Sequence, residues 1–464
     1  IVSADLVTNQ DFTINSVTIG KGANSVAANT VLGENALDAS VSGGNNTAIG
    51  KDTLSDLTSG ARNTSIGADA GENITTGNDN VSVGMGSLGT LTTGSNNTSL
   101  GKGSLALATT SSNNTALGYD ALNANTTGTR NVGVGSFSLA ANTTGDDNTA
   151  VGYNSLYYNT TGSDNVALGT GALQANTTAS YNTAVGRSAL VANTTGSYNT
   201  AVGDSALKAN TTGEYNTAVS RASLYNNTTG SSNVGLGINS LHSNTTGASN
   251  IAIGDSTLQY NTTASNNTSV GHHSLRANTT GAANTAIGSG SLNANTTGVD
   301  NVAVGQSALN RNTTASYNTS VGRQALYTNT TGGANTSIGY QSLDANTTAS
   351  NNTALGYTAL IANTTGADNV AIGKDSMDTN TTGSHNTSVG TDSLQNNSTG
   401  SYNTAIGKNS LATNSTASYN TATGYSALVG NTTGANNVAV GHDSLFTNTT
   451  GSDNTAVGRN ALIS

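Results

Sequence analysis

The sequence predicts an all-β fold, a parallel β-solenoid of about 26 coils built from a 17-residue repeat. Asn recurs at every seventeenth position from Asn29 to Asn454, giving 26 copies without insertion or deletion. When each repeat is numbered from this Asn, position 4 is aliphatic and position 5 is Gly in 25 copies, and position 9 is Leu in 24. Because a 17-residue unit is too small to bury a core alone, such repeats become stable only when they stack.

Residues 1–28 precede the regular repeat and are predicted to form an irregular N-terminal cap, or a joint to a further part of the protein. The chain opens at Ile1 without Met, so we expect that a signal peptide or an upstream domain has been removed. Residues 16–20 look like the repeat core, although Gly20 is out of register with the later Gly column. The candidate buried residues of this segment, which alternate loosely along it, are Val2, Leu6, Val7, Phe12 and Ile14.

The solenoid itself is predicted over residues 29–464. Positions 2 and 4 are expected to face inward from a short strand, because alternate strand residues share a face. Positions 8 and 9 supply the second inward contact, and positions 12–15 (Asn-Thr-Thr-Gly or Ala) are expected to add a second strand and a turn. Strands one coil apart pair about 4.8 Å from each other, which predicts a rod on the order of 120 Å long. In two central repeats the predicted core residues are Val185, Leu190, Val202 and Leu207.

Two columns of Asn, at positions 1 and 12, are predicted to form hydrogen-bonded ladders. A side-chain amide has both donors and an acceptor, so each Asn of a stack can donate to one neighbour and accept from the other. The second column runs unbroken from residue 125 to residue 448. Representative ladder residues are Asn182, Asn199 and Asn216 at position 1, and Asn125, Asn193 and Asn210 at position 12.

The alternative for the second column is glycosylation, because each of its Asn residues begins an Asn-Thr/Ser-Thr sequon. The equivalent positions of earlier repeats carry Leu57, Ile74 and Leu91. Apolar residues at the same place in the coil indicate an inward-facing site, and this favours the ladder.

Composition excludes several classes of partner. The net charge is −10, and nucleic acid binding needs a basic surface instead. Cysteine is absent, so disulfides and thiolate metal sites are absent too. No apolar run reaches the ~18 residues of a membrane span.

No catalytic, cofactor or metal site is predicted, and the protein is therefore not expected to be an enzyme. No nucleophile is paired with a base in a recurring copy, and no Gly-rich motif opens a helix. The five His residues occupy variable positions, and His272 and His273 should point to opposite sides of a strand. No cofactor is implied by any other pattern.

Tyrosine is the most conspicuous variable residue. Tyr181, Tyr198 and Tyr215 all occupy position 17, so they should form a column at one corner of the coil. Such a column can bind a saccharide, or it can simply cover the corner. These three residues are the candidate saccharide-facing positions.

The block Asn-x-Ala-aliphatic-Gly, as in 165–169 and 250–254, resembles the head repeat of trimeric autotransporter adhesins. It is also similar to long repeats of bacteriophage tail fibres and bacterial surface fibres. The resemblance implies a β-roll assembled as a homotrimer and located outside the cell, on a virion or a cell surface. Such fibres often end where a C-terminal chaperone cleaves itself off after a Ser, and Ser464 fits that position. Burial of two aliphatics per coil does not offset the entropy of ordering 17 residues, which also favours association.

The function predicted from these features is that of a structural fibre shaft, from a phage tail fibre or a bacterial surface adhesin, that projects a receptor-binding part. Its partners would be further copies of itself and a cell-surface glycan or receptor. One alternative is a self-assembling extracellular filament, because the last coil is half finished and leaves a strand edge unpaired. Another is an ice- or saccharide-binding solenoid, suggested by the Thr columns at positions 13 and 14.

Overall fold

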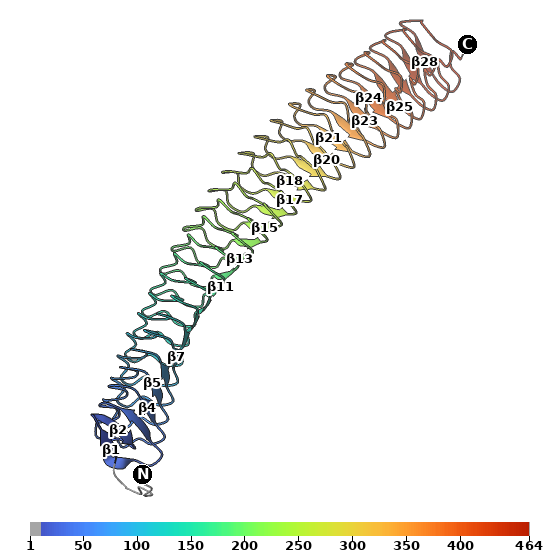
Figure 1. Cartoon of the computed structure of the whole chain (residues 1–464). Helices are drawn as coiled ribbons and strands as arrows, with labels where there is room; N and C mark the ends of the chain where they lie inside the picture. The colour runs from blue at the N-terminus through green and yellow to red at the C-terminus, as the bar shows by residue number, and fades with distance from the viewer. Residues whose placement is uncertain (1–10, 464) are drawn as a thin grey trace, which may run out of the picture. The chain divides into compact units, whose positions relative to one another are not determined.

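A computed structural model describes residues 11–463 of the chain. The candidate buried residues Val2, Leu6 and Val7, and the terminal Ser464, lie outside this range. The chain divides into two compact units, residues 1–231 and 232–464. Within each unit, successive coils lie one on the next along the chain (Figure 1).

The N-terminal unit contains 14 strands in its described part, together with one 3-10 turn, Ala23–Ser25. The strands are β1 (Phe12–Ile14), β2 (Val17–Gly20), β3 (Thr30–Gly33), β4 (Thr47–Ile49), β5 (Thr64–Ile66), β6 (Val81–Val83), β7 (Thr98–Leu100), β8 (Thr115–Leu117), β9 (Val132–Val134), β10 (Thr149–Val151), β11 (Val166–Leu168), β12 (Thr183–Val185), β13 (Thr200–Val202) and β14 (Thr217–Val219).

The C-terminal unit contains another 14 strands in the range that the structure describes. They are β15 (Val234–Leu236), β16 (Ile251–Ile253), β17 (Thr268–Val270), β18 (Thr285–Ile287), β19 (Val302–Val304), β20 (Thr319–Val321), β21 (Thr336–Ile338), β22 (Thr353–Leu355), β23 (Val370–Ile372), β24 (Thr387–Val389), β25 (Thr404–Ile406), β26 (Thr421–Thr423), β27 (Val438–Val440) and β28 (Thr455–Val457).

From β3 onward, neighbouring strands within a unit pair in parallel and in register. β12 and β13, for example, align Thr183 with Thr200 and Val185 with Val202. β16 and β17 of the C-terminal unit pair in the same way, again 17 residues apart. The predicted all-β parallel β-solenoid with a 17-residue period is therefore confirmed.

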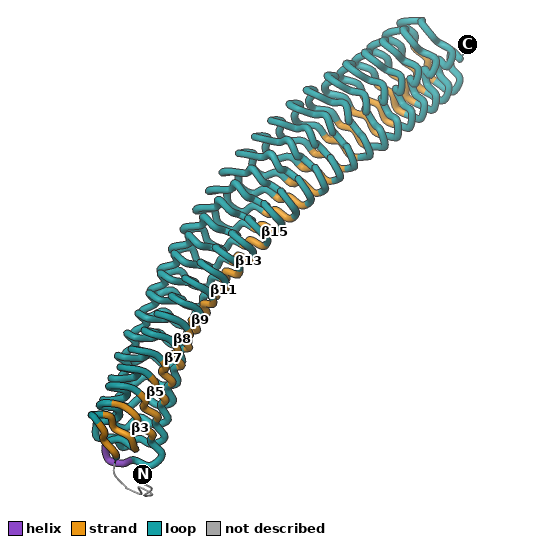
Figure 2. Tube along the Cα trace, viewed as in Figure 1, coloured by secondary structure: helices purple, strands orange, loops and turns teal. Residues whose placement is uncertain are grey.

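Each coil contains only one strand, and the second strand expected at positions 12–15 does not form. Figure 2 shows this as a single file of short strands in each unit, with turns and bends around the rest of the coil. In the coil that begins at Asn182, the side-chain amide of Asn193 instead donates to the carbonyl of Gly196, three residues on. This bond closes a turn from Asn193 to Gly196. The two Thr residues between them are therefore part of the turn and do not form a strand.

The N-terminal segment folds as a hairpin whose second strand, β2, runs against the direction of the coil strands. β1 pairs with β2 antiparallel, and β2 pairs antiparallel with β3 of the first coil. Asn15 and Ser16 form the two-residue connection, both with positive φ (49° and 68°), as type I′ hairpin turns require. The reversed direction of β2 explains why Gly20 is out of register with the later Gly column.

The expectation that Phe12 and Ile14 are buried is wrong. Their exposed fractions are 42% and 53%. Phe12 pairs across the hairpin with Ile19, and Ile14 pairs with Val17. Cross-strand partners share a face, so the four apolar side chains lie together, on a face that residues 11–463 leave exposed.

The assignment of positions 2 and 4 to the interior is also wrong. Val185 and Val202, at position 4, are half-buried on the outer face of the sheet. Ala184 and Ala201, at position 3 between the two outward-facing positions, point inward and are fully buried. The reason is the narrow interior. Even at Gly133, a position-3 residue, an added Cβ would lie 3.0 Å from Ser138 Oγ and 3.3 Å from a Leu122 carbon. An alanine or serine fits this space closely in the later coils, and only the first coil, with Val31 buried at 2% exposure, holds a valine there.

The leucine at position 9 fills the interior, as predicted. Leu190 and Leu207 are fully buried, and both adopt left-handed backbone conformations, with φ of 52° and 50°. That conformation costs roughly 1–2 kcal/mol for a residue with a side chain. Full burial of a leucine contributes about 2 kcal/mol, which offsets the cost. The one Gly at this position, Gly71, has the same conformation (φ 59°).

Glycine at position 5 allows the coils to approach closely. Gly186 has a φ of 135°, and a Cβ added to it would lie 2.5 Å from the carbonyl oxygen of Gly203 in the next coil. Ser220 replaces this Gly once, with a φ of 105°.

Among the helices of the described residues, none is long and apolar enough to cross a membrane.

Candidate functional site

The Asn column at position 1 forms the first predicted ladder. Oδ1 of Asn182 accepts the backbone N–H of Asn199 at 2.9 Å, and Oδ1 of Asn199 accepts that of Asn216 at 3.0 Å. Asn199 Nδ2 also donates to the Gly213 carbonyl of its own coil at 2.8 Å, whereas Asn182 Nδ2 donates to the Ser180 carbonyl of the preceding repeat at 3.3 Å. These side chains are fully buried, so the column satisfies backbone groups that water cannot reach.

The Asn column at position 12 forms the second ladder, by direct contact between side chains. Asn193 Nδ2 donates to Oδ1 of Asn176 at 3.0 Å, and Asn210 Nδ2 donates to Oδ1 of Asn193 at 2.8 Å. The column begins at Asn125, whose Oδ1 accepts from Asn142 at 2.8 Å. The asparagine ladders are thus confirmed at both positions.

The burial of the second ladder bears on its sequons. The side chains of Asn125, Asn193 and Asn210 have no exposed surface. Nδ2 of Asn193 and of Asn210 donates both to the ladder and to the carbonyl at position 15, and Nδ2 of Asn125, the first of the column, donates to the carbonyl at position 15. A glycan attached to Nδ2 would displace both bonds and enter the packed interior. In the folded coil these sequons are therefore ladder residues.

A third column follows the exposed corner at position 13. Thr194 donates its Oγ1 hydrogen to the carbonyl of Thr211 in the next coil at 3.0 Å, and its backbone N–H to the same oxygen at 2.9 Å. The hydroxyl donors of this column are thus directed along the stack. Only the position-14 residues, such as Thr195, remain fully exposed on this corner.

The predicted tyrosine column at position 17 stacks face to face. The ring centroids of Tyr181 and Tyr198 are 4.9 Å apart with an interplanar angle of 9°, and those of Tyr198 and Tyr215 are 5.0 Å apart with an angle of 4°. Both faces of Tyr198 are therefore covered by its neighbours. A sugar ring could stack only on the outer face of Tyr181 or Tyr215, at the ends of the column.

The two adjacent histidines do not point to opposite sides. The rings of His272 and His273 stack with their centroids 3.7 Å apart. The alternation argument fails because these residues follow the strand, in a turn where His273 has a φ of 56°. Within residues 11–463, no group of three or more His, Cys, Asp or Glu side chains is placed to hold a metal ion.

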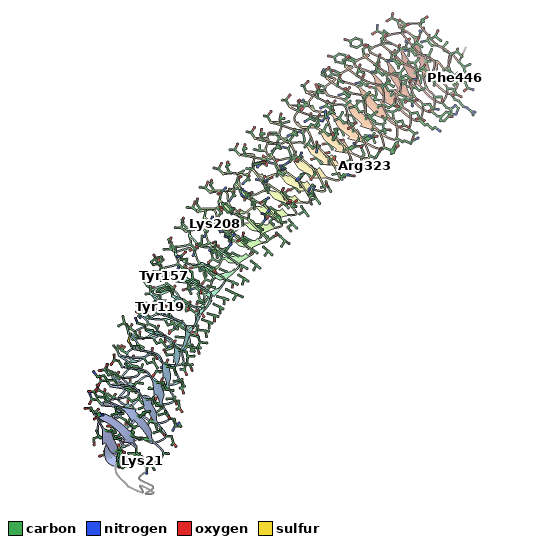
Figure 3. All side chains as sticks on the ribbon, in the orientation of Figure 1. Lys21, Tyr119, Tyr157, Lys208, Arg323 and Phe446 are labelled. Carbon is green, nitrogen blue, oxygen red and sulfur yellow. The ribbon has the colours of Figure 1, made fainter. Side chains whose placement is uncertain are left out.

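Sequence reasoning missed a group of rings on the N-terminal unit, because they occupy different positions of three successive coils. Phe137 contacts Tyr119, Tyr153 and Tyr157 edge to face, at centroid distances of 5.2, 6.2 and 6.1 Å. Tyr157 contacts Tyr158 at 4.6 Å. We call these five residues the aromatic cluster. Tyr119 and Tyr157 are labelled along the same edge of the unit in Figure 3. A search for aromatic residues at positions 6, 7, 10 and 11 would have found the cluster.

Position 10 of the C-terminal unit carries two carboxylates in an unfavourable setting. Oδ1 of Asp344 and Oδ1 of Asp378 are buried without a hydrogen-bond partner among the described residues. Burial raises the pKa of Asp344, and the charge of Arg311 lowers it by less. Burial likewise raises the pKa of Asp378, although Gln395 opposes the shift by a hydrogen bond.

We expect Asp344→Asn to stabilise its coil at neutral pH and to have no effect in acid. Because folding raises the pKa of this carboxyl, the folded state loses stability as pH rises from the pKa of an ordinary Asp, about 3.9, through the pKa in the folded state. Asn has the same shape and no charge to desolvate. The effect is measured by the hydrogen exchange of residues 335–360 in the variant and in the unmodified protein, once at about pH 7 and once with an acid pulse near pH 3. Faster exchange of the variant at neutral pH would contradict the prediction.

Comparison of the sequence with known protein families finds no family that matches the chain, and no curated protein matches it either.

Proposed function

We propose that the chain is the structural shaft of an extracellular fibre, of the kind found in phage tail fibres and bacterial surface adhesins. The observation that carries the proposal is the continuity of hydrogen bonding from coil to coil. Between the coils that begin at Asn182 and Asn199, the backbone N–H groups of Leu190, Ala192 and Thr194 all donate to carbonyls of the next coil. Both Asn ladders cross the same junction. A stack tied in this way resists extension along its axis, which a shaft requires.

We further propose that the shaft assembles from copies of this chain, as a homotrimer. The outer face of the sheet supports self-association. Position 4 places an aliphatic side chain on this face in every copy except Thr423, and the exposed fractions of Leu168 and Ile253 are 46% and 36%. Position 2 beside it is Thr, Val or Ile, and positions 2 to 4 carry no charge in any copy. A continuous apolar strip of this kind is normally covered by another surface.

The experiment that tests assembly compares the native mass of the full chain with that of a variant carrying Leu168→Lys, Val185→Lys and Val202→Lys. We expect three times the chain mass of 45.8 kDa for the unmodified protein and a folded monomer for the variant, because three adjacent charges would be desolvated in the contact. The matched control carries Lys in place of Thr178, Thr195 and Thr212, which are exposed at position 14 of the same coils.

Light scattering after size exclusion measures the masses, and circular dichroism verifies that both variants fold. A monomeric unmodified protein would refute self-association, and an oligomeric position-4 variant would refute this choice of face. The shaft itself is tested separately by electron microscopy of the unmodified protein. Compact particles would refute it.

A further inference from the structure

We propose that the aromatic cluster of the N-terminal unit is a binding site for a neutral saccharide, in which pyranose rings stack on Tyr153 and Tyr158. This inference does not depend on the fibre role. It uses residues at positions 6, 7, 10 and 11, and not the tyrosine column at position 17.

The ring geometry leaves aromatic faces available. The four ring contacts of the cluster are edge to face, with interplanar angles of 67° to 85°. An edge-to-face pair covers one face of one ring only, whereas a parallel stack covers a face of both. The exposed fractions of Tyr119, Tyr153 and Tyr158 are 44%, 54% and 52%, and it is the edge-to-face geometry, not this exposure, that separates them from the stacked Tyr198. The C–H groups on one side of a pyranose pack well on such a face, whose partial charge is negative.

The cluster borders two adjacent hollows. One, of about 220 Å³, is lined by Phe137, Tyr153, Asn154, Tyr157, Tyr158 and Gln174. The other, of about 260 Å³, is lined by Asp120, Asn123, Ala124, Phe137, Ala140, Ala141 and Tyr157. Phe137 and Tyr157 belong to both and so lie between them. Two small hollows that share an aromatic wall and are otherwise lined largely by polar groups suit two consecutive sugar units, whose hydroxyl groups need polar partners beside the stacking surface.

The side-chain amides beside the rings are available for hydroxyl groups. No hydrogen bond within residues 11–463 engages the side-chain amides of Asn154 and Gln174, which line the first hollow. In the second hollow, Asp120 accepts from Asn123 at 3.3 Å and also makes a side-chain hydrogen bond with Tyr119, so its carboxylate is already engaged. The charges near the cluster are balanced, because Lys102 lies over the Tyr119 ring at 5.9 Å and Asp120 is its nearest anion. Amides and a single carboxylate without excess charge favour a neutral sugar over an anionic one.

Phe137 supplies an independent indication of function. It occupies position 7, where the backbone is left-handed and most copies carry Asn, Asp, Ser or Gly. Its φ is 60°, an uncommon conformation for a bulky residue that costs on the order of 1–3 kcal/mol. The fold imposes this conformation at position 7 of every coil, so what distinguishes Phe137 is that a bulky ring is tolerated there despite the cost. In the fold, the ring of Phe137 holds three tyrosines at fixed angles.

Apart from the isolated Tyr317, the tyrosines outside the cluster have a structural explanation that most of the cluster lacks. Tyr402 and Tyr419 stack in parallel at 5.1 Å. Tyr225 and Tyr327 each lie against a cation, Lys208 or Arg311, with the charge 5.1 Å from the ring centroid. In the cluster only Tyr119 has such a cation. The other members neither stack in parallel with a ring of the next coil nor lie against a cation. Their concentration in three coils is best explained by a ligand.

The test is saturation-transfer NMR of the full chain with the methyl glycosides and short oligomers of glucose, galactose and N-acetylglucosamine. We expect transfer to the ring protons of at least one series, stronger for a disaccharide than for a monosaccharide. The double variant Tyr153→Ala/Tyr158→Ala should weaken binding by about tenfold or more, because two stacking surfaces are lost. Gln174→Ala should weaken it with the rings intact.

Two control variants make the result specific. Tyr198→Ala removes a ring whose faces are covered, and Tyr317→Ala removes an isolated ring with an exposed fraction of 66%. Neither should change sugar binding. Absence of transfer to every sugar, equal loss in Tyr198→Ala, or binding of a proline-rich peptide with no sugar binding would each overturn the proposal.

Discussion

Replacing Leu190 by Asp is expected to unfold its coil and to loosen the coils on either side, with a loss of about 3–5 kcal/mol of local stability. The side chain has no exposed surface, and the backbone N–H of Leu190 donates to Ala206 in the next coil at 3.0 Å. A carboxylate at this place would be desolvated, and the described structure offers no cation within the core to pair with it. In a stack where each coil depends on its neighbours, damage stays close to its origin.

Thr195→Asp is the matched control for this prediction. It adds the same charge to the same coil, at a fully exposed position whose hydroxyl has no recorded bond, and should change stability by less than about 0.5 kcal/mol. Hydrogen exchange and limited proteolysis, resolved to residues 165–215, measure both variants. Equal protection of the two would show that inside and outside have been assigned wrongly.

Replacing Asn199 by Ala is expected to cost about 2–3 kcal/mol, because it removes the side-chain acceptor of a buried backbone N–H group and one donor to a buried carbonyl. Oδ1 of Asn199 accepts the backbone N–H of Asn216, and Nδ2 of Asn199 is one of two donors to the Gly213 carbonyl. The loss should appear as faster exchange of the Asn216 amide hydrogen and its neighbours, measured in the full chain.

Asn210→Leu is the comparison that separates the two ladders. The Gly213 carbonyl keeps its bond from Asn199, so no backbone group of this coil loses its last partner. Leu57 shows that the same place in the coil accepts leucine, fully buried beside Leu54 and Gly60. We therefore expect Asn210→Leu to cost less than half as much as Asn199→Ala. The reverse order would mean that contacts between side chains, and not capture of backbone N–H groups, stabilise the stack.

Several features of the coil surface were not predictable from the repeat alone. The aromatic cluster is dispersed in the sequence over 40 residues, from Tyr119 to Tyr158. Its members meet because positions 6, 7, 10 and 11 of adjacent coils are neighbours in space, which requires the path of the turns. The tyrosine column was predictable, since a single position recurs. That its rings cover one another, and so leave few faces for a sugar, was visible only in three dimensions.

The sequence alone determined the period, the parallel in-register stacking and the asparagine ladders. Identical residues 17 positions apart, such as Asn182 and Asn199, must lie above one another once each repeat forms one coil, and an amide repeated in this way can bond only to itself or to the neighbouring backbone. The tertiary structure decided which strand face is inside. Alternation defines two faces without ranking them, and hydrophobicity favoured Val185. In the coils after the first, where Val31 is buried, the left-handed turns, including the one at Leu190, leave an interior that holds one leucine and only a small residue opposite it. Ala184 therefore points inward, and the larger valine faces out.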